Sequence, residues 1–222
     1  TVVFKPSEMT PATGAAMAEC WAEAGLPDGV FNLVHGTGEH AGAPLVAHED
    51  VRLISFTGGT DTGAKVAASA AAGFKKLSLE LGGKNSTIVF ADADMESTIP
   101  GVVRASFLNQ GQICLCGSRI LVERSIYDDF REQFLNAVEN MTVGDPSDSD
   151  TELGALISAE HRDKVASYIE LAQEEGGTIV SGGGAPEGIP KEFENGNWLA
   201  PTVVDGLASD SRCSTEEIFG PV

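Results

Sequence analysis

The chain has 222 residues, of which 42% are hydrophobic and 21% charged, so it can bury a substantial core in one large domain or two modest ones. Its 14 Lys and Arg against 33 Asp and Glu give a formal net charge of −19, a field that repels phosphate backbones and anionic lipid surfaces. We therefore expect neither a nucleic-acid nor a membrane partner.

The first 80 residues alternate between short strands and helices. Residues 1–4 are β-branched or aromatic and predict a strand that ends before Pro6. Thr10 and Pro11 predict the start of a helix that ends at Gly25, with Cys20 in the core. Further strands are predicted at 30–34, 52–56 and 76–81, and a further helix at 64–72.

A glycine-containing loop, Thr57 to Gly63, connects one of these strands to the helix after it. Glycines let backbone N–H groups approach an anion, and a helix N-terminus adds a favourable dipole. The layout favours phosphate binding, although the Gly58-x4-Gly63 spacing differs from the G-x-G-x-x-G of ordinary dinucleotide folds and is a weak signal by itself.

The remainder of the chain continues the alternation. Asp92 and Asp94 precede a helix that Pro100-Gly101 should kink or restart. Ser125 to Asp128 predicts a capping box at the start of a second helix, and Ser158 predicts the cap of a third. Strands are predicted at 88–90, 119–122 and 178–180, a surface loop at 182–197, and extended structure at 198–204. The helical spacing of apolar residues predicts that the following side chains face inward: Ile126, Phe130, Phe134, Val138, Met141, Val165, Tyr168, Ile169 and Ala172.

Two side chains are candidates for chemistry. Cys114 follows the glycine-containing turn Asn109-Gln110-Gly111-Gln112, and its thiolate could attack a carbonyl carbon. Glu80 stands between two leucines, an apolar setting that can raise the pKa of a carboxyl group toward the range of a general base. Spacing alone leaves open that Cys114 is a buried core residue and Glu80 a solvated strand end.

The four cysteines carry no Cys-x-x-Cys pair and no disulfide-like density, which favours a reducing, cytoplasmic location. Cys114 and Cys116 lack a second Cys/His cluster at ligand spacing, so no metal site is expected.

Six stretches, in order along the chain, resemble motifs of the NAD(P)-dependent aldehyde dehydrogenases. They are Lys5-Pro6-Ser7-Glu8, residues 26–32 (LPDGVFN), Phe56-Thr57-Gly58, residues 79–84 (LELGGK), Gly111-Gln112-Ile113-Cys114 with Arg119, and residues 217–222 (EIFGPV).

This resemblance implies a three-layer α/β fold. Residues 1–80 would be the C-terminal part of an NAD-binding, Rossmann-type domain, and residues 81–222 a truncated catalytic domain. Cys114 would be the nucleophile and Glu80 the base that activates water for thioester hydrolysis. The implied cofactor-binding residues are Lys5, Glu8, Thr57, Gly58, Gly59, Gly63, Leu81, Glu217 and Phe219, of which the last two would position the nicotinamide ribose and ring.

The resemblance also carries finer expectations. Lys5 and Glu8 would bind the adenosine ribose hydroxyls, and because a glutamate there repels a 2′-phosphate, NAD is favoured over NADP. The family commonly has serine where this chain has Gly59, so one hydroxyl to the pyrophosphate is absent. The family's second oxyanion donor, an asparagine, has no matching position here, and the blunt ends of the chain suggest an internal fragment of a homo-oligomeric parent.

Substrate expectations follow from Gly111 to Cys116, Ser125 to Tyr127 and Gly154 to Ser158, which resemble the 2-aminomuconic and 2-hydroxymuconic semialdehyde dehydrogenase branch. Betaine-aldehyde or broad aliphatic enzymes are the alternative. A non-catalytic relative, and a relative that passes the thioester to coenzyme A or phosphate, also stay open.

Overall fold

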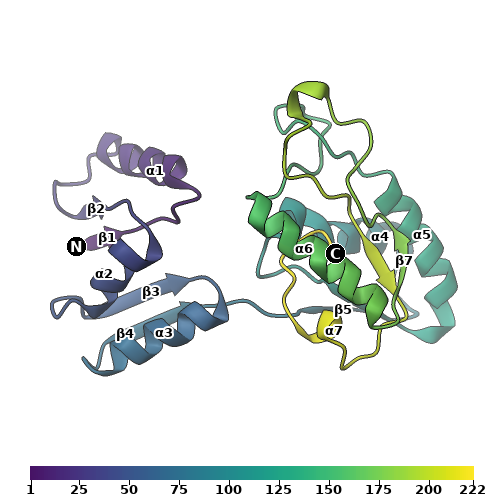
Figure 1. Cartoon of the computed structure of the whole chain (residues 1–222), viewed down its shortest axis with the longest axis horizontal. Helices are drawn as coiled ribbons and strands as arrows, with labels where there is room; N and C mark the ends of the chain where they lie inside the picture. The colour runs from purple at the N-terminus through teal and green to yellow at the C-terminus, as the bar shows by residue number, and fades with distance from the viewer. The chain divides into compact units, whose positions relative to one another are not determined.

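The computed structural model describes residues 1–222, which form two compact units, Thr1–Gly82 and Gly83–Val222. Each unit is an α/β structure built from two pairs of hydrogen-bonded strands (Figure 1). No helix combines the length and the apolar character that crossing a bilayer requires.

The first unit contains two parallel strand pairs, each connected through a helix. Strand β1 (Val2–Phe4) pairs with β2 (Phe31–Leu33) across α1 (Pro11–Glu23), and β3 (Leu53–Thr57) pairs with β4 (Lys76–Glu80) across α3 (Thr60–Ala71). Parallel pairing places the carboxyl ends of both strands at one edge, where open α/β sheets bind ligands. Between β2 and β3 lie a short π-helix, η1 (Gly38–Gly42), and α2 (Ala43–Ala47).

The core of the first unit is small, with Ile54, Val66 and Ala70 buried against one another. The prediction that Cys20 lies in this core is wrong, because its side chain is exposed on α1. The buried position of α1 is Gly14, where an added Cβ would lie 2.8 Å from Cγ of Pro6. Cys20 is six residues further along and therefore points well away from that face.

The second unit contains the parallel pair β5 (Ser86–Val89) and β6 (Arg119–Val122) and the antiparallel pair β7 (Thr178–Ser181) and β8 (Val203–Asp205). Helix α4 (Met95–Phe107) runs without a break through Pro100 and Gly101, so the expected restart is absent. Burial of the apolar face of this helix offsets the loss of the hydrogen bond that proline cannot make. The other elements are η2 (Leu108–Gly111), η3 (Arg124–Ile126), α5 (Tyr127–Glu139), α6 (Ala159–Glu174), η4 (Lys191–Phe193) and α7 (Arg212–Thr215).

The main core lies between α4, α5 and the β5–β6 pair. Phe130, Phe134 and Val138 form the predicted inward face of α5, and the Phe130 and Phe134 rings stack with centroids 5.6 Å apart. The predicted capping box at Ser125 is wrong, since its hydroxyl donates to the Glu123 carboxylate at 2.7 Å instead of capping the helix. The predicted cap at Ser158 is confirmed, because its Oγ accepts the His161 N–H at 3.1 Å.

Candidate functional site

The carboxyl edge of the β3–β4 pair brings several predicted residues together. Thr57 and Glu80 are register partners at the ends of these strands, and the Gly58 N–H donates to the Glu80 carbonyl at 3.1 Å. Gly59 occupies the N-cap of α3, and no side chain caps that helix. The backbone N–H groups of its first turn are therefore available to an anion, although Asp61 in the same turn opposes one.

Leu81 packs directly on Gly63. A Cβ at position 63 would lie 2.5 Å from Cδ2 of Leu81, so a larger residue there would push the leucine away. This close approach joins the first turn of α3 to the segment that follows β4. It explains in physical terms why glycine stands at position 63.

Lys5 and Glu8 lie together at the carboxyl edge of the β1–β2 pair. The Lys5 Nζ donates to the carbonyls of Pro6 at 2.6 Å and Gly36 at 3.0 Å, and lies 3.6 Å from Oε2 of Glu8. The pKa of Glu8 lies below its usual value because the carboxylate accepts its own backbone N–H and sits beside the Lys5 charge. The Glu8 carboxylate thus places a negative charge at this edge.

Glu80 does not have the apolar surroundings that its neighbouring leucines predicted, since its side chain is exposed. In strand β4 alternate side chains point to opposite faces, so sequence neighbours do not enclose one another.

The loop before Cys114 has an unusual backbone. Asn109, Gln110 and Gly111 all have left-handed conformations, with φ of 53°, 57° and 68°. For residues other than glycine this conformation costs of order 1 to 3 kcal/mol and persists only where the surroundings hold it. Cys114 then lies in a tight turn closed by the Cys116 N–H donating to the Ile113 carbonyl at 3.0 Å.

The Cys114 side chain is exposed, and no acceptor in the chain takes its backbone N–H. Cys116, two residues on, is buried, and burial raises the pKa of its thiol. The two cysteines therefore differ in kind: one is an accessible thiol beside a free N–H donor, and the other is a packing residue.

Asn85 holds this turn, although no motif in the sequence identified it. Its Nδ2 donates to the carbonyls of Cys114 at 2.6 Å and Cys116 at 3.3 Å. Asn85 comes just before β5 and 29 positions before Cys114. A contact between side chain and backbone over that separation leaves no local pattern in the sequence.

The segment containing Glu217 and Phe219 lies against the same loop. A Cβ on Gly111 would lie 2.0 Å from the Gly220 carbonyl oxygen, so the two backbones meet directly. Oε1 of Glu217 accepts the Gly83 N–H at 3.2 Å, and Phe219 is left-handed with φ of 61°. The second unit thus brings together the predicted nucleophile and two of the predicted cofactor residues.

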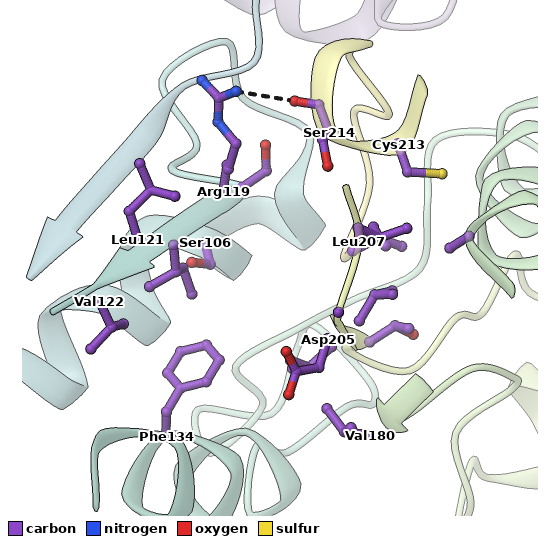
Figure 2. Close-up of a pocket in the computed structure, with 18 of the residues that line it drawn as sticks. Ser106, Arg119, Leu121, Val122, Phe134, Val180, Asp205, Leu207, Cys213 and Ser214 are labelled. Atoms are coloured by element: carbon purple, nitrogen blue, oxygen red, sulfur yellow. Dashed lines mark hydrogen bonds between the residues drawn. The ribbon is translucent and has the colours of Figure 1, made fainter. Parts of the chain in front are cut away.

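A separate cavity of about 490 Å³ opens between β6 and β8 (Figure 2). Its lining is largely apolar and includes neither Cys114 nor Glu217. Two of the titratable groups on its wall have large pKa shifts: burial lowers the pKa of Lys84 to about 8, and burial raises the pKa of the Cys213 thiol to about 11. Arg119 donates to the Ser214 carbonyl across one end at 3.3 Å (Figure 2).

The chain is similar in sequence to proteins of one known family. The sequence model described as "Aldehyde dehydrogenase family" matches residues 1–222. A 2-aminomuconic 6-semialdehyde dehydrogenase from Pseudomonas sp is 48% identical over 222 residues, which are 100% of this chain and 45% of that protein. The chain therefore spans about half the length of the curated relatives that it matches.

Solved structures agree with the sequence matches. The crystal structure of PnpE in complex with nicotinamide adenine dinucleotide is 44% identical with a TM-score of 0.95, over 100% of this chain and 45% of that one. Betaine aldehyde dehydrogenase from Staphylococcus aureus in complex with NAD+ is 40% identical with a TM-score of 0.94, over 100% of this chain and 44% of that one. The expected α/β fold is confirmed by these similarities.

Proposed function

The chain belongs to the aldehyde dehydrogenase family, and on that premise we propose that it supplies the nucleophile and much of the cofactor site for NAD-dependent oxidation of an aldehyde to a carboxylic acid. The observation that carries the proposal is the setting of the Cys114 side chain. Its exposed thiol stands on a turn fixed by Asn85 and beside its own unpaired N–H, in the loop whose Gly111 meets the segment of Glu217 and Phe219.

The reaction that we propose begins at the Cys114 thiolate, which adds to the aldehyde carbon and forms a thiohemiacetal. The Cys114 N–H would donate to the oxyanion that forms in this step, a proposal supported by the lack of any acceptor for it in the chain. NAD, when bound, would supply the hydride acceptor that oxidation of this adduct requires. A thioester then remains on Cys114.

Hydrolysis of this thioester requires a base to take a proton from water. We assign that role to Glu80, the carboxylate at the end of β4. Release as the acid distinguishes this proposal from transfer of the acyl group to coenzyme A or phosphate. Accumulation of a covalent acyl-enzyme in a Glu80→Gln variant, observed by intact-protein mass, would support the assignment.

We assign binding of the diphosphate and adenosine parts of NAD to residues of the first unit. The uncapped first turn of α3 offers N–H donors, and Gly59 leaves its approach open. At the β1–β2 edge the Glu8 carboxylate would repel a 2′-phosphate, which favours NAD over NADP. Thr57, Gly58, Gly63 and Leu81 would shape the carboxyl edge of the β3–β4 pair, next to that helix turn. We accordingly propose residues 1–80 as the cofactor-binding part and residues 81–222 as the catalytic part.

The substrate that we propose is a muconic-type semialdehyde, since the relative from Pseudomonas sp carries that activity in its name. Betaine aldehyde is the alternative, supported by the similarity to the betaine aldehyde dehydrogenase structure. Because the former is an anion and the latter a cation, one assay separates them. The ratio kcat/KM would be measured for each, and for a neutral aliphatic aldehyde, by NADH absorbance.

The test of the reaction uses the native protein with these aldehydes, NAD and NADP. We expect NADH formation with the carboxylic acid as product, loss of both in Cys114→Ser, and a strong preference for NAD. Absence of NADH with every aldehyde would overturn the proposal in favour of a non-catalytic relative. A coenzyme A or phosphate requirement would overturn the hydrolytic step.

We also propose a homo-oligomeric protein of the cytoplasm, where its free thiols would stay reduced. Light scattering of the native protein would give the number of subunits, and cell fractionation would give the compartment.

A further inference from the structure

His161, in the first turn of α6, contacts Phe219 through both backbone and ring. The His161 Nε2 lies 2.6 Å from the Phe219 carbonyl oxygen, and since a carbonyl can only accept, this nitrogen carries the proton. The two rings also meet edge to face, with centroids 5.9 Å apart and planes at 72°. One side chain thus restrains the orientation of both the peptide group and the aromatic ring at position 219.

Phe219 needs such a restraint. Its φ of 61° is the left-handed conformation, which a bulky residue leaves unless neighbouring groups hold it. The peptide after Phe219 is the point where the backbone passes Gly111 of the cysteine loop. A change of φ at this position would move the aromatic ring and the Gly220 carbonyl together.

The residues before Phe219 are held independently of His161. Ile218 is buried in a core cluster with Val165 of α6. The Glu217 carbonyl accepts from Lys164 Nζ at 3.3 Å, and its carboxylate accepts the Gly83 N–H at 3.2 Å. Loss of the His161 contact should therefore release Phe219 without unfolding the segment as a whole.

We infer that His161 is a positioning residue that sets the Phe219 conformation for contact with the nicotinamide, an inference that rests on the proposed function of Phe219 as a cofactor residue. His161 touches neither the thiol nor, in this assignment, the cofactor. It acts through Phe219, by donating one hydrogen bond and packing one ring edge. This assigns a function to a histidine that no motif in the sequence distinguished.

The test compares His161→Ala, His161→Phe and His161→Gln in the native protein, with Glu170→Gln as a control on an exposed position of the same helix. His161→Phe keeps the ring but loses the donor, whereas His161→Gln keeps a donor. We expect the KM for NAD to rise about tenfold and kcat to fall up to about 10²-fold in His161→Ala and His161→Phe. His161→Gln and added imidazole with His161→Ala should recover part of the loss, and Glu170→Gln should match wild type.

A second readout separates positioning from general damage. Hydrolysis of an activated ester by Cys114 needs no hydride acceptor, so its rate should fall far less than NADH formation in the His161 variants. Wild-type kinetics in His161→Phe, or equal losses in both reactions with no recovery in His161→Gln, would overturn the inference while leaving the proposed function intact. If wild type reduces no NAD with any aldehyde, the proposed function itself fails, and this inference fails with it.

Discussion

Gly111 and Gly220 meet backbone to backbone, so closely that a Cβ on Gly111 would lie 2.0 Å from the Gly220 carbonyl oxygen. This contact joins the loop of the proposed nucleophile to the segment of the proposed nicotinamide residues, since Gly220 lies 109 positions after Gly111 in the chain. Glycine at 111 also permits φ of 68°. The contact therefore couples the geometry of the thiol to that of Phe219.

Gly111→Ala should destabilise the protein by on the order of 3 kcal/mol, because backbone atoms must move and the left-handed conformation becomes costly. Gly101→Ala is the matched control: it lies inside α4 with no atom within 4 Å of an added Cβ, and should stabilise by about 0.5 to 1 kcal/mol. Urea denaturation of both variants measures the difference. Equal stability of the two variants would contradict the role of the backbone contact.

Thiol reactivity should divide the four cysteines into two pairs. Cys20 and Cys114 are exposed, whereas Cys116 and Cys213 are buried and their thiol pKa values are raised by burial. Iodoacetamide at pH 8 should therefore label the first pair in the folded protein and the second pair only after denaturation. Peptide mass analysis with time would show this, and fast labelling of Cys116 would contradict the assignment of that residue to packing.

The apolar faces were the most predictable part of the fold. Phe130, Phe134 and Val138 recur at helical spacing, and the structure buries all three. Cys20 was misplaced because the periodicity of an alanine-rich helix does not say which side packs; the buried side is instead set by Gly14. Ser125 was misread because a nearby acceptor, Glu123, competes for its hydroxyl.

The site was only partly predictable, for a different reason. Short motifs made Cys114 and Glu217 candidates because each stands among sequence neighbours that together resemble a known motif. Asn85 contributes through two hydrogen bonds to backbone carbonyls 29 and 31 positions away, and His161 through one hydrogen bond to a carbonyl 58 positions away. Any donor of the right reach could make such a bond, so only the folded chain reveals it.

Substitution of Asn85 should loosen the cysteine turn. Asn85→Ala removes two hydrogen bonds, to the Cys114 and Cys116 carbonyls, and should cost about 1 kcal/mol because the site is exposed. Asn85→Asp should cost more, since a carboxylate faces the two carbonyl oxygens with no proton to donate. Hydrogen exchange over residues 113–117 should quicken in both variants. If exchange in Asn85→Asp matches wild type, Asn85 does not hold the turn.

The half-buried ammonium group of Lys84 should make folding stability depend on pH. Burial lowers its pKa from 10.5 to about 8, so between these values the unfolded chain binds more protons than the folded one. The contribution of Lys84 to the free energy of unfolding therefore rises with pH between about 8 and 10.5, and is lost as the pH falls toward 8.

Lys84→Met removes the titrating group, so the variant should be more stable than wild type at pH 7, and this advantage should shrink by pH 10. Lys191→Met, at an exposed lysine, should show no such trend and serves as the control. Urea denaturation of the three proteins from pH 7 to pH 10 measures the differences. A constant offset between Lys84→Met and wild type across that range would mean that burial of the side chain does not shift its titration, and that Lys84 stays charged through the whole interval.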